Sequence, residues 1–276
     1  FAIPIYNERV GIEGKLSHNN AFRFFDELER RFHRKTIRVK SNHEKIRMRE
    51  GKMAGFSTDY ACAVQVILLA DHFGFDSIVT GMPLENSYFF HGYKHRDFGD
   101  SWFWKHHSTL FQQVGLPIYQ PVAGCSELIT MRIVEKNGLT GWAQSCLRSK
   151  EGGQICGQCW KCFRKNSLIG HPITMSNEIE AFLAKKPLKQ AISTLYSIQK
   201  SVERGDGKSI LKLFPDVAEQ MGLDLSWLER YYADSLELLP EKYREFTELR
   251  LDEYADKMTE ADISKMESID LYPDSD

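Results

Sequence analysis

Four of the six cysteines lie within one short stretch and are spaced as metal ligands: Cys146, Cys156, Cys159 and Cys162. A Cys-x2-Cys step lets two thiolates face one cation. A third cysteine three residues further on, with a fourth from the preceding loop, completes a tetrahedral set of sulfur ligands. Gly152, Gly153 and Gly157 relieve the backbone crowding of a turn around a metal. The spacing therefore predicts a structural zinc site.

Other sulfur chemistry is compatible with the same cysteines. A disulfide pair, a redox-active Cys-x2-Cys centre and an iron–sulfur cluster all use thiols at short spacing. Disulfides are disfavoured because the sequence shows no secretory signal, and zinc is favoured over a cluster. The other two cysteines, Cys62 and Cys125, are expected in the core.

The first 140 residues alternate short β-branched runs with amphipathic stretches, which is the pattern of a mostly parallel α/β sheet. Strands are expected at 1–6, 36–39, 77–80 and 116–119. Helices are expected from residue 19 or 20 to about 32, from 57 or 58 to 73, from 100 to 113, and to 138 after a Ser126 cap. Ligands bind beyond the carboxyl ends of strands in doubly wound sheets, so residues 81–100 are the candidate ligand loop.

After Pro172 the pattern is nearly all helical, with a capping box predicted at Thr259 to Asp262. The expected organisation is an α/β core over residues 1–170 and a helical domain over 171–276. The net charge of −2 hides an asymmetry of about +7 in the first part and about −9 in the second. A basic core suits a phosphate-bearing ligand, and an acidic extension suits solvation or a docking partner.

Composition limits the class of protein. At 276 residues and 42% hydrophobic content, the chain can bury a sizeable core. The longest apolar run, around Val64 to Ala70, is far shorter than the roughly 20 residues of a membrane span. We expect a cytoplasmic globular protein with no membrane contact.

Several of these motifs together resemble one enzyme family. Ser145-Cys146-Leu147 and the run from Cys156 to Arg164 are similar to the zinc knuckle of the 7-cyano-7-deazaguanine synthase family of PP-loop ATP pyrophosphatases. Asp76 to Gly81 followed by Glu85-Asn86 resembles its strand and Gly-x-x-x-Glu-Asp turn, and the region after it is similar at Tyr93, Arg96 and Phe98. Ser126 to Ile129 resembles the helix that leads into the knuckle. The likeness covers roughly residues 1–170.

The resemblance implies a doubly wound PP-loop fold, a structural Zn²⁺, and ATP with Mg²⁺. It also implies that ATP adenylates the carboxylate of 7-carboxy-7-deazaguanine and that an amine then displaces AMP, with a second activation giving the nitrile. The nucleotide- or substrate-binding candidates are Gly81, Glu85, Asn86, Tyr93 and Arg96, together with Ser57 and Asp59 at a helix start. Phe89, Phe90 or Tyr93 is a candidate for stacking on a purine-like base.

Three features differ from the biosynthetic enzymes. The Ser-Gly-Gly-x-Asp-Ser phosphate loop does not occur in the 276 residues, so we expect it, with the first strand, upstream of Phe1 in a longer native chain. Cys125-Ser126 and Asn86 stand where the family usually has Lys and Asp. The helical extension resembles relatives in the Qat and type IV CBASS anti-phage defence systems, which suggests that a partner protein's amine replaces ammonia and docks on this extension.

The main alternative is a non-catalytic module that binds nucleic acid or protein on a degenerate PP-loop core. A PP-loop enzyme that thiolates tRNA is a weaker alternative, because such enzymes place their catalytic cysteines differently. Direct binding of nucleic acid is not expected for the enzyme, since the basic surplus is modest.

Overall fold

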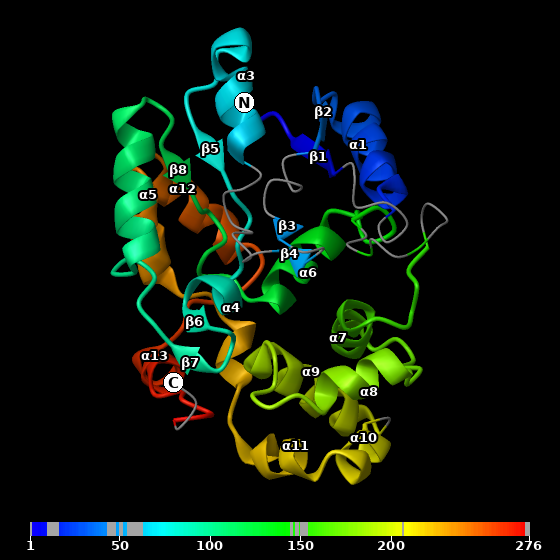
Figure 1. Ribbon diagram of the computed structural model, residues 1–276. Coiled ribbons are helices and arrows are strands. Elements are labelled where there is room, and N and C mark those ends of the chain that lie inside the picture. Colours follow the sequence, from blue (N-terminus) through cyan, green and yellow to red (C-terminus); the bar gives the residue numbers. More distant parts are fainter. Residues whose placement is uncertain are drawn as a thin grey trace. The chain divides into compact units, whose positions relative to one another are not determined.

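The computed structural model describes residues 2–9, 17–42, 48–49, 52–53, 63–143, 146, 149, 154–205 and 207–273 (Figure 1). The chain forms two compact units. Unit 1 comprises Phe1–Thr80, Ser108–Ile118 and Gly138–Cys156, and unit 2 comprises Gly81–His107, Tyr119–Asn137 and Gly157–Asp276. The C-terminal helices share unit 2 with two segments of the expected α/β core, and the expected domain boundary at residue 170/171 stays a prediction.

Unit 1 contains a parallel β-α-β arrangement. Strand β1 (Ile5–Arg9) pairs in parallel with β2 (Ile37–Ser41), Ile5 opposite Ile37, across helix α1 (Asn19–Phe32). The apolar stripe of α1 buries Phe25, whose ring meets the edge of Tyr6 at 5.8 Å. The right-handed twist of strands makes this the natural way to join two parallel strands through a helix. The expected parallel α/β pattern is confirmed here.

The other strands are short. In unit 1, β3 (Met48–Arg49) runs antiparallel to β4 (Lys52–Met53), and β5 (Ile78–Val79) follows α3 (Ala63–Phe73). Strand β5 pairs with β8 (Ile118–Tyr119), and the strands of the described residues form four two-stranded sheets. The structure is thus mixed α/β with a small parallel sheet, and a continuous doubly wound sheet stays a prediction.

Unit 2 is mainly helical. A short hairpin of β6 (Phe89–Phe90) and β7 (Lys94–His95) follows helix α4 (Leu84–Ser87), and helix α5 (Trp102–Gln113) contributes to both units. The further helices of unit 2 are α6 (Glu127–Lys136), α7 (Trp160–Ile169), α8 (Asn177–Leu183), α9 (Ala191–Arg204), α10 (Lys208–Leu213), α11 (Pro215–Glu219), α12 (Glu241–Asp252) and α13 (Glu260–Glu267), with 3₁₀ turns η2 (Gln220–Gly222), η3 (Ser226–Glu229) and η4 (Ala233–Leu238).

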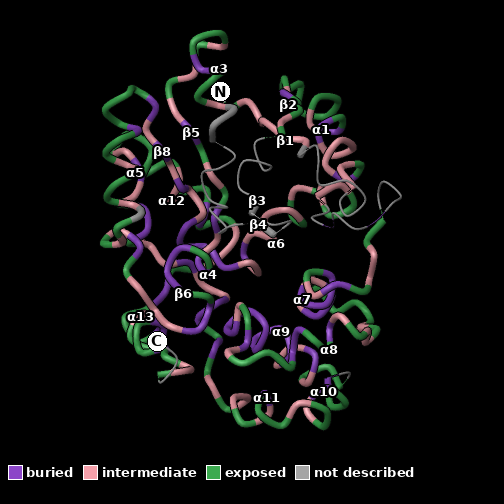
Figure 2. Tube along the Cα trace, in the orientation of Figure 1, coloured by how far each residue is buried: buried purple, intermediate pink, exposed green. Residues whose placement is uncertain are grey.

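Helix α9 is central to the core of unit 2. Every residue from Ala191 to Ile198 is buried, which Figure 2 shows as a continuous purple stretch. Such a helix tolerates polar residues because their hydroxyls return to its own backbone: Ser197 donates to the carbonyl of Ser193 at 2.7 Å. Around it, Phe89 stacks on the fully buried Trp227 with ring centroids 5.9 Å apart. The hairpin of the candidate ligand loop is therefore part of this core.

Two predicted caps are confirmed. Ser126 caps α6 by accepting a hydrogen bond from the Ile129 amide at 3.3 Å, and Thr259 and Asp262 form a reciprocal capping box at the start of α13. Within the described part of the chain, no helix has the length and hydropathy that crossing a bilayer requires.

Candidate metal centre

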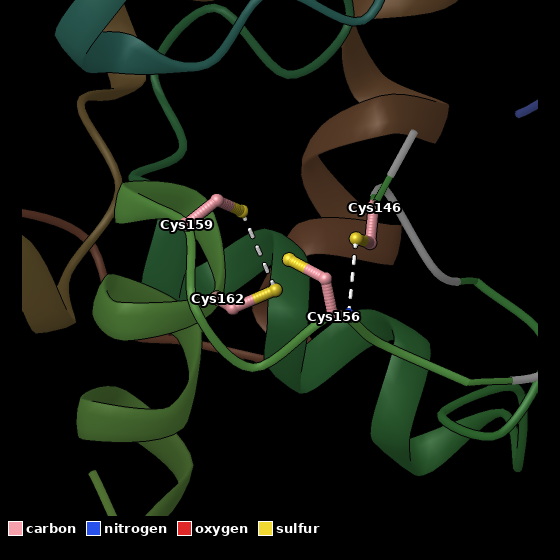
Figure 3. Close-up of side chains that lie close together, drawn as sticks. All are labelled: Cys146, Cys156, Cys159 and Cys162. Carbon is pink, nitrogen blue, oxygen red and sulfur yellow. Dashed lines mark hydrogen bonds between the residues drawn. The ribbon is translucent and has the colours of Figure 1, made fainter. Parts of the chain in front are cut away.

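The four cysteines of the predicted zinc site converge. The Sγ atoms of Cys146, Cys156, Cys159 and Cys162 all lie within 4.8 Å of one another (Figure 3). Tetrahedral zinc with Zn–S bonds of about 2.3 Å places its sulfurs about 3.8 Å apart, and the Cys159 and Cys162 sulfurs are 3.5 Å apart. The cluster can therefore hold one metal ion such as zinc. An iron–sulfur cluster fits less well, because its ligands bind different iron atoms and must stand farther apart.

Helix α7 positions two of the ligands. Cys159 is its N-cap residue, with an extended backbone, and Cys162 lies in its first turn. Both side chains are buried, at 4% exposure each. Backbone N–H groups and the helix dipole favour negative charge at this end of a helix, so the thiolate forms that bind metal are stabilised here. Gly157, with φ of +68°, makes the turn between Cys156 and α7.

The segment that carries the other two ligands is fixed by a residue that the sequence analysis did not identify. Asn20 of α1 is 2% exposed, and its Nδ2 donates to the carbonyls of Cys146, at 3.1 Å, and Gln154, at 2.9 Å. The Cys156 amide also donates to the Cys146 sulfur at 3.3 Å. An Asn at a buried helix position is the one signal that could have indicated this role. Gly152 and Gly153 lie outside the described residues.

A chain of interactions between three charged residues, two of which are buried, runs from α7 to α4. An Arg164 Nη donates to the Glu127 carboxylate at 3.0 Å, and the Arg164 guanidinium lies over the Trp160 ring at 4.9 Å. The Glu127 amide, in the first turn of α6, donates to both carboxylate oxygens of Glu85, at 2.9 and 3.0 Å. Arg164 and Glu85 are each 6% exposed. The contacts of Glu127 with Arg164 and with Glu85 join segments that are far apart in sequence, so residue spacing could not predict them.

Burial shifts the pKa values of several ionisable groups in this part of unit 2. Burial, followed by the nearby Glu127 carboxylate, raises the pKa of the Glu85 carboxyl to about 7, against the lowering effect of the hydrogen bonds from the Glu127 amide. Burial also raises the pKa of the Cys125 thiol to about 12, which keeps it protonated and agrees with its predicted place in the core. Lys165 has a lowered pKa, again mainly through burial.

The other candidate residues of the ligand loop have different surroundings. Arg96 donates to the carbonyls of Asn86, at 3.0 Å, and Ser87, at 3.2 Å, and so holds the α4 turn against the hairpin. Tyr93 is 4% exposed and packs edge-on against Tyr272 at 5.4 Å. Asn86 and Gly81 are exposed.

The structure thus brings Glu85, Asn86 and Arg96 together, and their binding of ligand stays a prediction. Of the three aromatic residues considered for stacking on a base, Phe89 and Tyr93 are buried, and Phe90 is 43% exposed. Ser57 and Asp59 lie outside the described residues.

The fold and the site together define a mixed α/β protein with a cluster of four cysteines that could bind a metal. The chain belongs to a family of unknown function, DUF6395, whose model matches residues 106–270. The matched region includes the four cysteines and most of unit 2. No curated protein and no solved structure is significantly similar to the chain.

Proposed function

We propose that the protein is a zinc-containing, ATP-dependent enzyme that activates 7-carboxy-7-deazaguanine and joins it to an amine. The four-cysteine cluster carries this proposal. Its spacing and flanking residues are those that resemble the deazaguanine synthase knuckle, and its sulfurs lie within 4.8 Å of one another. The parallel strands β1 and β2 and the loop that follows β5 are compatible with a PP-loop core.

The proposed reaction has two transfers. A carboxylate oxygen of the deazaguanine attacks the α-phosphorus of ATP, and pyrophosphate leaves with Mg²⁺. The amine nitrogen then attacks the acyl carbon, loses a proton, and AMP leaves with the carboxylate oxygen. With ammonia the product is an amide, which a second activation dehydrates to the nitrile; with a protein amine it is a conjugate.

The protein's part in such a reaction is to orient the reactants and neutralise charge rather than to supply a nucleophile. Zinc, when bound, fixes the fold of the knuckle. Exposed groups near α4 are the candidates for contacting substrate: the Asn86 side chain can hydrogen-bond a base edge, and Phe90 can stack on its face. Arg96 holds the turn that carries Asn86 through its hydrogen bonds to the carbonyls of Asn86 and Ser87.

AMP formation tests the proposal. The full native chain, with one zinc confirmed by elemental analysis, is incubated with ATP, Mg²⁺ and 7-carboxy-7-deazaguanine, with and without ammonia. We expect AMP only when the deazaguanine acid is present. Dependence on ammonia indicates synthesis of the free base, and a mass increase on a co-purified protein indicates conjugation.

Two variants refine the test. Asn86→Ala is expected to reduce AMP formation, while Asn177→Ala, an exposed asparagine at the start of α8, serves as the matched control. No AMP under any condition, from folded zinc-loaded protein, would favour a non-catalytic module that binds protein or nucleic acid.

A further inference from the structure

The first turn of helix α7 has few stabilising features of its own. The Cys159 side chain accepts no capping hydrogen bond from the helix, and the first turn contains no acidic residue. Helix starts usually rely on such groups, which satisfy the free N–H donors and the positive end of the dipole. Cys159 and Cys162 lie at this helix start, so a metal bound by their thiolates would supply the negative charge and the anchoring that the first turn otherwise lacks.

Arg164 connects the start of α7 with α6. It follows Cys162 by two residues, and its guanidinium is held by the Glu127 carboxylate and the Trp160 ring. Among the described residues, its Nε has no hydrogen-bond partner. A buried guanidinium with one carboxylate partner cannot move from it without leaving a charge uncompensated, so α7 and Glu127 must move together.

Glu127 in turn fixes α4. Its amide is one of the free donors at the start of α6, and both oxygens of Glu85 accept from it. Helix α4 has four residues, too few to be stable alone. A second anchor is the Leu84 amide, which donates to the carbonyl of Cys125 at 2.8 Å, just before α6. Arg96 holds the other end of α4 to the hairpin, so the two anchors at Leu84 and Glu85 are those that lie at the N-terminal end of α6.

We propose that the chain Arg164–Glu127–Glu85 is a structural link through which metal bound at the cysteine cluster orders the α4 turn. Arg164 is its positioning residue. The link acts within unit 2 and requires no chemistry on ATP, so it goes beyond the proposed function and can be tested apart from it.

Hydrogen exchange on the native chain with and without zinc tests the link directly. Peptides covering residues 82–90 and 124–130 are compared with α12 of the same unit as an internal control. We expect zinc to slow exchange in the first two at least about tenfold and in α12 less than about twofold. An unchanged rate in α4, or an equal change in α12, overturns the link.

Variants then identify the residue that transmits the effect. Arg164→Met retains the length of the side chain and removes the charge, and Arg132→Met is the matched control, because Arg132 of α6 pairs with Glu229 instead. We expect both variants to bind one zinc by elemental analysis. In Arg164→Met the zinc-dependent slowing in α4 falls below about twofold, and in Arg132→Met it stays at the wild-type value.

Slowing in Arg164→Met as large as in the wild type contradicts the link. Should that variant fail to fold, Glu127→Gln provides the second test, because it keeps the amide that Glu85 accepts from and removes the charge that Arg164 pairs with. Its α4 is expected to lose the zinc response as well, and a full response in it overturns the proposal. An unchanged α4 rate in the wild-type comparison overturns the link without either variant.

Discussion

The cysteine segment 146–162 and the loop 81–100 were both predicted as functional regions, yet their side chains behave differently. The four cysteines converge to within 4.8 Å. In the loop, Glu85 and Tyr93 are buried in internal contacts, Arg96 braces the α4 turn, and Asn86 and Gly81 face outward. The spacing of cysteines a few residues apart is enough to predict that they meet. Which side chains of a binding loop are free to contact a ligand depends instead on how the loop packs against the rest of the protein.

The largest expected effect is at the cluster. Structural zinc sites bind with about 10–16 kcal/mol, so one ligand of four contributes about 2.5–4 kcal/mol. Cys162→Ala should therefore weaken zinc binding about 70- to 900-fold, measured by competition with a chromogenic chelator. Cys125→Ala is the control: this cysteine is equally buried and outside the cluster, so affinity should not change. Equal zinc affinity in the two variants would mean that Cys162 is not a zinc ligand.

Gly92 tests whether the loop is fixed in the core or free to adapt. Its φ is +79°, and an added Cβ would lie 2.6 Å from the Cα of Gln190. Gly92→Ala should cost about 2–3 kcal/mol in the free energy of unfolding, through backbone strain and overpacking against α9. Gly81→Ala, which meets open space, should stay within about 0.5 kcal/mol.

Urea unfolding measures both glycine variants. A tolerated alanine at residue 92 would mean that the hairpin can move away from α9, as an adaptable binding loop does.

Local patterns predicted the elements well where the determinants are close in sequence. The α1 stripe, the Ser126 cap and the Thr259 capping box are examples, since each depends on residues within one or two helical turns. The convergence of the four cysteines could be predicted for the same reason, since all four lie within one short stretch of the chain.

The contacts that could not be predicted from the sequence join residues that are far apart in the chain. Glu85 meets an amide 42 residues away, and Asn20 meets a carbonyl 126 residues away. No neighbouring residue in the sequence shows whether the Glu85 carboxylate contacts a substrate or accepts hydrogen bonds from the first turn of a helix. The division into units likewise depends on how α8 to α13 pack with segments 81–107 and 119–137, which periodicity does not encode.

The adjacent residues Glu85 and Asn86 are expected to differ in role: Glu85 stabilises the fold, and Asn86 is a candidate for binding substrate. Glu85→Ala leaves the Glu127 amide without its acceptor and should lower the free energy of unfolding by about 2 kcal/mol. Asn86→Ala, at an exposed position, should change it by less than about 0.5 kcal/mol. Thermal unfolding of both proteins, with zinc bound, checks this difference. Similar costs at the two positions would mean that Asn86 also serves the fold.

The smallest expected effect is a pH dependence that distinguishes the two regions by its sign. The pKa of Glu85 rises from 4.5 to about 7 on folding, so the folded state holds this proton more tightly. Its contribution is fully present below pH 4.5 and is lost as the pH rises through 7. Between pH 6 and 8 the loss is about 1 kcal/mol. The cluster has the opposite slope, because protons compete with metal for thiolates and acid weakens it.

Glu85→Gln isolates the carboxyl, since the amide keeps an acceptor oxygen and cannot ionise. With zinc saturating, the free energy of unfolding of wild type minus variant is measured in urea at pH 6, 7 and 8, which cancels the titration of cysteines and histidines common to both. The difference should become less favourable to the wild type as the pH rises. A flat difference would mean that Glu85 is ionised throughout, held so by the Glu127 amide and Arg164. The α4 turn would then share the acid sensitivity of the metal site instead of opposing it.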